Sequence, residues 1–158
     1  YRFRRFWVKN KKTNNYKMKK ILIVNANYYK DITKRLVFAA RNSLKQDKVK
    51  IKLLEVPGVF EIPIAIKKNI KRFDGFIATG CVIKGETPHF DLICRATFNG
   101  IMHISIHYNK PIGNGIITAL NKKQALKRCG KINSTKKNKG LEAAKAVLSI
   151  LKNGQKQI

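Results

Sequence analysis

Short apolar runs alternate with segments of helical periodicity along most of this chain. Residues 20–25 hold four consecutive apolar side chains, which is typical of a strand buried on both faces. Ile32, Leu36, Ala40 and Leu44 then recur every four residues, which predicts a helix. The same patterns predict further strands at residues 50–56, 75–83, 102–108 and 116–119, and further helices at residues 63–73, 87–99, 121–129 and 139–152.

This alternation of strands and helices predicts a single α/β domain, in which helices cover both faces of a parallel sheet. In such sheets, ligands bind beyond the carboxyl ends of the strands. The loops that we expect to carry function are residues 26–31, 57–63, 84–90 and 111–115, which follow the first four predicted strands.

The chain is strongly basic. Its 158 residues include 35 Lys and Arg against 8 Asp and Glu, a formal net charge of +27, while 44% of the residues are hydrophobic. A basic surface can bind nucleic acid. Lys outnumbers Arg 27 to 8, however, and Lys, Asn and Ile are all encoded by A/T-rich codons. Since base-reading surfaces favour Arg, nucleic-acid binding is kept only as an alternative to a lysine-coated, solvated surface.

The cysteines and histidines form no evident metal or disulfide pattern. The three cysteines include no CxxC pair, and we expect them to behave as small buried apolar groups. His103 and His107 lie four residues apart, but an HxxxH metal site requires a helix, and this segment is expected to be a strand. No apolar run approaches the roughly 20 residues of a membrane helix.

Residues 1–17 differ from the rest of the chain. They carry seven positive charges and no acid, with aromatic residues scattered among the charges. Met18 then leads directly into the first apolar strand. We expect residues 1–17 to be a basic, disordered extension and residues 18–158 to be the folded domain. The extension lacks the apolar stretch of a secretory signal, and a cytoplasmic location is expected.

The loop at residues 84–90 combines features of a phosphate-binding and proton-transfer site. Gly85 permits close backbone approach, and free N–H groups at the start of the following helix suit a phosphate. Thr87 and Pro88 form a good pair of N-cap and first-turn residues. His89 would then lie in the first turn, where a neutral imidazole can accept and return a proton. An ordinary surface histidine is the alternative.

Five ordered segments carry a family resemblance. Residues 56–63 read VPGVFEIP, 80–91 read GCVIKGETPHFD, 110–118 read KPIGNGIIT, 124–128 read QALKR and 138–144 read NKGLEAA. In this order they resemble the lumazine synthases, over roughly residues 19–152. The resemblance implies a flavodoxin-like, three-layer αβα sandwich built on a four-stranded parallel sheet.

The resemblance also implies an enzyme of riboflavin biosynthesis, in the transferase class. Its substrates would be two small molecules, 5-amino-6-ribitylaminopyrimidinedione and 3,4-dihydroxy-2-butanone 4-phosphate. Their condensation gives 6,7-dimethyl-8-ribityllumazine, phosphate and water, and the family needs neither a metal nor an organic cofactor. Much of the acceleration would come from holding the two substrates together.

Candidate site residues follow from the resemblance, position by position. His89 matches the proton-transfer histidine. The positions that hold the pyrimidine and ribityl groups are matched by Tyr28, Val59, Phe60, Glu61, Val82, Ile83 and Asn114. The phosphate-binding positions are matched by Gly85, Glu86, Thr87, Arg128 and Lys139. In the family the site lies between subunits, so Asn114, Arg128 and Lys139 would come from the neighbour of the subunit that donates His89.

Departures from the family pattern leave a second hypothesis open. Tyr29 stands where Asn is frequent, and Asn114 stands where many members carry an aromatic residue. The alternative to an active enzyme is therefore a catalytically weak lumazine- or flavin-binding relative. The linker at residues 129–138 is longer than in members that form icosahedral shells, which favours a homopentamer or decamer. Riboflavin synthase is a candidate protein partner.

Overall fold

The structure, a computed structural model, describes residues 17–131 and 138–153. Its elements are β1 (Lys19–Ala26), α1 (Lys30–Lys45), β2 (Val49–Val56), η1 (Val59–Glu61), α2 (Ile62–Asn69), β3 (Gly75–Ile83), α3 (His89–Tyr108), β4 (Ile112–Ala119), α4 (Lys122–Cys129) and α5 (Lys139–Asn153). The predicted extension at residues 1–17 lies outside the described residues, apart from Lys17. None of the described helices is long and apolar enough to cross a membrane.

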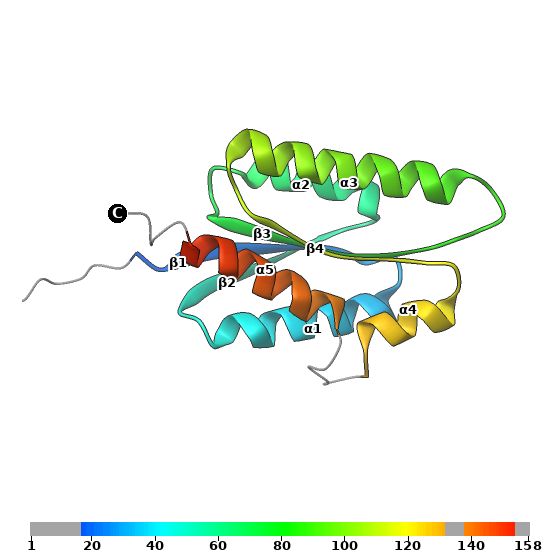
Figure 1. The fold of residues 1–158 in the computed structure, drawn as a ribbon, viewed down its shortest axis with the longest axis horizontal. Coiled ribbons are helices and arrows are strands. Elements are labelled where there is room, and N and C mark those ends of the chain that lie inside the picture. The colour runs from blue at the N-terminus through cyan, green and yellow to red at the C-terminus, as the bar shows by residue number, and fades with distance from the viewer. Residues whose placement is uncertain (1–16, 132–137, 154–158) are drawn as a thin grey trace, which may run out of the picture.

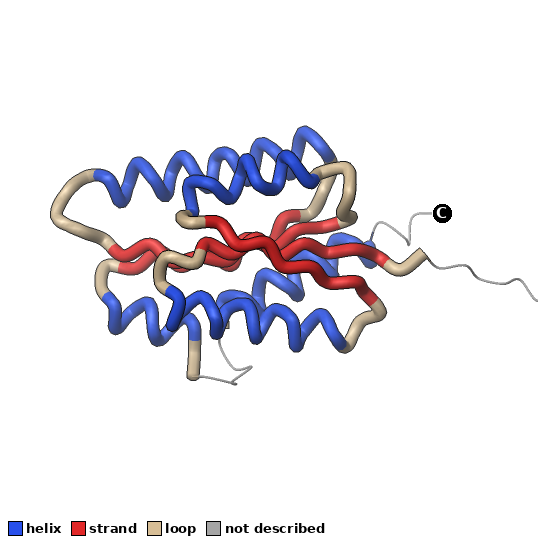
Figure 2. Tube along the Cα trace, turned by 180° about the vertical axis from the view of Figure 1, so that it is seen from behind, coloured by secondary structure: helices blue, strands red, loops and turns tan. Residues whose placement is uncertain are grey.

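The four strands form one parallel sheet in the order β2-β1-β3-β4. Ile23 of β1 lies opposite Leu53 of β2 on one side and opposite Ile77 of β3 on the other. α2 and α3 cover one face of the sheet, and α1, α4 and α5 cover the other (Figures 1 and 2). The predicted α/β class, three-layer arrangement and four-stranded parallel sheet are therefore confirmed.

Each face of the sheet has its own apolar core. Leu22 and Val24 of β1 pack under α2 and α3, whereas Ile21 and Ile23 pack under α1 and α5. Successive side chains of a strand point to opposite faces. Both faces of β1 are covered, so its apolar run is continuous rather than alternating.

The strand predicted at residues 102–108 is wrong. α3 continues through this segment to Tyr108 as one helix. Thr97, Ile101 and Ile104 are buried at helical spacing and face the sheet. The isoleucines in this segment favour a strand locally, but packing of one helical stripe against the sheet decides the structure.

Gly100, which directly follows the helix end predicted near Asn99, lies within α3. A Cβ atom on Gly100 would lie 3.2 Å from side-chain carbons of Pro63, so the glycine marks the close approach of α3 to α2. The helix ends instead at Asn109, whose φ of 48° is the left-handed conformation that commonly terminates helices.

The longer α3 changes the numbering of the strands. The fifth strand predicted at residues 116–119 is the second half of β4, which begins at Ile112. Residues 111–115 therefore lie at the start of β4, and the prediction that they form a loop at the carboxyl edge is wrong. The fourth connection at that edge is residues 120–121, between β4 and α4.

The two edge strands of the sheet differ in their surroundings. β4 is covered by α5 and contacts α4, whereas β2 is only partly covered. Lys50 and Lys52 of β2 are exposed to solvent. β2, at the open edge, is the strand of the sheet that contains no buried residue.

Two glycines allow α5 to approach its neighbours closely. A Cβ atom on Gly140 would overlap the carbonyl oxygen of Leu36 in α1. A Cβ atom on Gly113 of β4 would overlap the carbonyl oxygen of Ala143 in α5. The start of α5 is consequently fixed against both α1 and the sheet.

Replacing Gly140 with alanine should lower the free energy of unfolding by about 1–3 kcal/mol, because the added methyl group overlaps backbone atoms. Gly85→Ala is the matched control, since no atom lies within 4 Å of the position its Cβ would take. Urea unfolding followed by circular dichroism measures both variants. Equal unfolding midpoints for the two would contradict the close packing of α5 on α1.

Candidate active site

Four connections meet at the carboxyl edge of the sheet, as is expected when all strands run parallel. They are residues 27–29 after β1, residues 57–58 and η1 after β2, residues 84–88 after β3 and residues 120–121 after β4. Two cavities are lined by residues of these connections and of the elements beside them. This edge is where the sequence predicts function.

The first cavity, which we call the aromatic cavity, has a volume of about 300 Å³. It is lined by Tyr28, Tyr29, Gly58, Val59, Phe60, Cys81, Val82, Ile83, His89 and Ile93. Six of the predicted site residues therefore lie together, namely Tyr28, Val59, Phe60, Val82, Ile83 and His89. Tyr28 is 72% exposed and Phe60 is 58% exposed, so both rings are open to a ligand.

Close packing beneath η1 sets the position of Phe60. A Cβ atom on Gly80 of β3 would lie 2.6 Å from Cγ1 of Val59, so η1 lies directly on the strand. On the other side of the cavity, the ring of Tyr28 makes an edge contact with the ring of Tyr29, with 4.9 Å between centroids. The exposed rings of Tyr28 and Phe60 are thus held by the connections that follow β1 and β2, respectively.

His89 is the first residue of α3, and its side chain is exposed. Its predicted place in the first turn of a helix is confirmed, but the predicted cap is wrong. Pro88, not Thr87, occupies the N-cap position and makes no side-chain capping bond. The Oγ1 atom of Thr87 accepts a long hydrogen bond of 3.4 Å from the N–H of His89.

Burial raises the pKa of two other ionisable groups of the aromatic cavity, Cys81 and Tyr29. Desolvation, together with smaller contributions from neighbouring Cys129 and Asp31, raises the pKa of the Cys81 thiol to about 12. Burial also raises the pKa of the Tyr29 hydroxyl. Cys81 is therefore a protonated thiol at neutral pH and cannot act as a nucleophile there. The imidazole of His89 is the group in this cavity that suits proton transfer.

The second cavity, which we call the cationic cavity, has a volume of about 900 Å³. It is lined by Phe90, Thr118, Ala119, Leu120, Gln124, Lys127, Arg128, Lys139 and Glu142. Two predicted phosphate-binding residues, Arg128 and Lys139, lie together here. With Lys127 they place three cations against one acid, Glu142, which favours an anionic ligand.

Two side-chain hydrogen bonds fix the start of α4, the helix whose last turn carries Lys127 and Arg128. The Oδ1 atom of Asn121 accepts from the N–H of Gln124 at 3.0 Å. The Oε1 atom of Gln124 accepts from the N–H of Leu120 at 2.9 Å. These reciprocal bonds satisfy backbone donors at the helix start and so define its direction.

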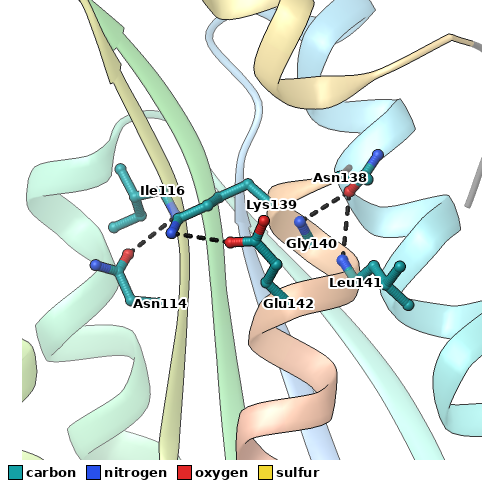
Figure 3. Close-up of polar contacts among 7 residues, drawn as sticks. All are labelled: Asn114, Ile116, Asn138, Lys139, Gly140, Leu141 and Glu142. Atoms are coloured by element: carbon teal, nitrogen blue, oxygen red, sulfur yellow. Dashed lines mark hydrogen bonds and ion pairs between the residues drawn. The ribbon is translucent and has the colours of Figure 1, made fainter. Parts of the chain in front are cut away.

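The buried side-chain amide of Asn138 connects α4 and α5, the helices that carry the phosphate-binding candidates Arg128 and Lys139. The Oδ1 atom of Asn138 caps α5 by accepting from the N–H groups of Gly140 at 2.8 Å and Leu141 at 3.3 Å (Figure 3). Its Nδ2 group donates to the carbonyl oxygens of Cys129, at the end of α4, and Arg35, in α1. The end of α4 and the start of α5 are thereby held together.

Glu142 is a site residue that the sequence reasoning missed. Its Oε2 atom lies 3.2 Å from Nζ of Lys139 (Figure 3). The signal was available, because residues three apart on a helix are neighbours and both residues belong to the NKGLEAA segment. An anion that binds Lys139 has to compete with this carboxylate.

One chain does not bring all the predicted residues together. Asn114 is exposed on β4, where its Oδ1 atom accepts from the N–H of Ile116 at 3.0 Å (Figure 3), and it lines neither cavity. Residues 85–87 are exposed in the connection after β3 and also line neither cavity. Glu61 is half-buried at the end of η1.

Comparison with known proteins identifies the family of the chain. The model of the 6,7-dimethyl-8-ribityllumazine synthase family matches residues 18–154. The chain is 39% identical over 137 residues to the 6,7-dimethyl-8-ribityllumazine synthase of Campylobacter curvus, covering 84% of this chain and 86% of that protein. It is 40% identical over 137 residues to that of Erythrobacter litoralis, covering 85% and 95%. The chain belongs to this family.

Membership in the lumazine synthase family makes the chain a transferase of riboflavin biosynthesis. The family and the enzyme class predicted from the sequence are thus confirmed. The roles of single residues stay predictions. The same applies to the longer linker at residues 129–138, most of which lies outside the described residues.

In the folded protein, the three cysteines should react slowly with an aromatic disulfide reagent. Burial raises the pKa of all three thiols, so the reactive thiolate is scarce near pH 8, below each raised pKa. Half-buried Cys94 should be labelled first, and buried Cys81 and Cys129 only on unfolding. Rapid labelling of Cys81 in the folded protein would contradict its burial.

Proposed function

We propose that this chain condenses 5-amino-6-ribitylaminopyrimidinedione with 3,4-dihydroxy-2-butanone 4-phosphate. The products are 6,7-dimethyl-8-ribityllumazine, phosphate and water. The observation that carries the proposal is the pairing of an aromatic cavity containing His89 with a cationic cavity containing Arg128, in a chain of the lumazine synthase family. Each cavity suits one of the two substrates.

The aromatic cavity suits the pyrimidine. Tyr28 and Phe60 offer exposed aromatic surface to a flat heterocycle, which gains from offset or edge contacts with such rings. Val82 and Ile83, at the end of β3, would border the ring partly through their backbone groups. Glu61 would accept hydrogen bonds from the ribityl hydroxyls at the end of η1.

The cationic cavity suits the phosphate of the butanone substrate. Arg128 can bind a phosphate through two parallel hydrogen bonds, and Lys139 adds a mobile positive charge once it leaves Glu142. The exposed backbone at residues 85–87 would add N–H donors near the start of α3. Holding the phosphate charge also makes phosphate a better leaving group.

His89 is proposed to move protons between steps. Imine formation between the pyrimidine amine and the butanone carbonyl releases water, and it requires a proton to be taken up and returned. Elimination of phosphate and closure of the second ring also require proton transfer. An exposed imidazole at the mouth of the aromatic cavity can serve each step in turn.

The complete site is proposed to form between two copies of the chain. Within one chain, His89 and Arg128 lie in different cavities, and Asn114 lies in neither. The layer formed by η1, α2 and α3 exposes several large apolar side chains that a second copy could cover, namely Phe60, Ile64, Leu92, Met102 and Ile106. A cyclic homopentamer, alone or as a pair, would give every copy the same two contacts.

Three further expectations belong to this proposal. The enzyme would work in the cytoplasm, where its product could pass to a riboflavin synthase. Residues 1–17 would form an extension to the catalytic domain at residues 18–158. Asn114 would replace ring stacking by a hydrogen bond to the pyrimidine.

Substitutions in the two cavities should have different kinetic effects. Arg128→Ala should raise KM for the butanone phosphate by about 10–100-fold, because it removes charge-assisted hydrogen bonds. His89→Ala should lower kcat by about 10²–10⁴-fold through lost acid–base catalysis. Absorbance of the lumazine product measures both, against the uncatalysed condensation.

Lys123→Ala is the matched control, since it removes one positive charge from α4 without touching either cavity. It should leave both constants unchanged. If wild-type protein does not exceed the uncatalysed rate while remaining folded, the proposed activity is wrong. A catalytically weak binding relative would then be the better description.

Mixing the two impaired variants tests whether the site is shared. After subunit exchange, His89→Ala and Arg128→Ala chains should together regain roughly a quarter of the wild-type rate, because random neighbours restore that share of intact sites. Native mass spectrometry confirms that mixed assemblies form. No regained activity in mixed assemblies would place the whole site within one chain.

A further inference from the structure

The chain's other two histidines lie on one face of a helix. The strand expected at residues 102–108 would have placed His103 and His107 too far apart to share a ligand. α3 instead runs through both residues, and positions four apart on a helix are neighbours on its surface. This is the spacing at which two imidazoles can hold one metal ion.

The two imidazole rings already lie side by side. Their centroids are 5.8 Å apart, their planes differ by 16°, and both side chains are exposed. The ring of His107 also contacts the edge of the Tyr108 ring, with 4.6 Å between centroids. A metal–nitrogen bond is about 2.0–2.1 Å long, so the exposed rings need only turn their nitrogens toward a common point.

Two imidazoles leave most of the coordination shell open. Among residues 17–131 and 138–153, no group of three or more metal-ligating side chains gathers. Water would therefore occupy the remaining positions. Such a complex is weaker than a closed structural zinc site, and its ion exchanges with solvent.

We propose that His103 and His107 chelate one divalent late transition-metal ion per chain on the exposed face of α3. Neutral imidazole suits Cu²⁺, Ni²⁺ and Zn²⁺, with Cu²⁺ bound most tightly, whereas Mg²⁺ and Ca²⁺ prefer oxygen ligands. Neither histidine lines the aromatic or the cationic cavity. The metal site therefore lies outside both cavities of the proposed condensation.

Isothermal titration of the full chain with Ni²⁺ tests the proposal. One ion should bind per chain, and Mg²⁺ at the same concentration should give no binding. His103→Gln or His107→Gln alone should weaken binding by about 100-fold, because the second imidazole binds intramolecularly once the first has bound. The double variant should lose the site, while His89→Gln should keep it.

Two compensating variants separate helical spacing from histidine number. Asn99 is exposed on α3, four residues before His103. Asn99→His in the His107→Gln background rebuilds the spacing and should restore tight binding. Arg95→His in the same background restores the number of histidines but places them two turns apart, and it should not restore binding.

Four results would overturn the proposal. Unchanged binding in the double variant would show that the ion binds elsewhere. Restoration by Arg95→His, or failure of Asn99→His to restore binding, would show that spacing does not matter. A ratio of one ion to two chains would show that the two imidazoles come from different copies.

Discussion

The side chain of Asn138 is the contact on which the cationic cavity depends. Its amide is almost fully buried, caps α5 with its oxygen, and binds carbonyl groups of α1 and α4 with its nitrogen. A buried amide with all these bonds made is stabilising, and each bond lost would leave a polar group without a partner. The relative position of Arg128 and Lys139 is therefore set by a residue that does not itself line the cationic cavity.

Much of the fold could be predicted, because the hydrophobic pattern of most elements agrees with the way those elements pack in the structure. β3 was predicted at residues 75–83, the bounds it has in the structure, since a strand buried on both faces is continuously apolar. α5 was predicted over residues 139–152 because its apolar stripe keeps one spacing throughout. The prediction ended α3 near Asn99 and placed a strand at residues 102–108, whereas the helix continues through Gly100 to Tyr108. The glycine is required by Pro63 of a neighbouring helix, and local sequence does not carry that information.

The candidate site, like the fold, could be predicted only in part. Val59 and Phe60 could be placed together from the sequence, because one connection carries both residues. That connection could be placed at the site, because the carboxyl ends of parallel strands meet at one edge of the sheet. The separation of His89 from Arg128 into two cavities depends on the arrangement of α3 and α4 in space. Glu142 was missed although its spacing from Lys139 was visible, because the family resemblance directed attention to the cations alone.

The open edge of the sheet has a consequence for how copies of this chain can meet. An exposed edge strand offers unpaired backbone groups to any other strand, and proteins commonly protect such edges with lysines. On β2, Lys50 and Lys52 hold hydrated charges at that edge, and a second sheet would have to remove their water and overcome their repulsion. The basic composition, whatever its origin in codon usage, thus disfavours pairing of β2 with a strand of another copy. The apolar layer that includes α2 and α3 is left as the surface available for ordered assembly.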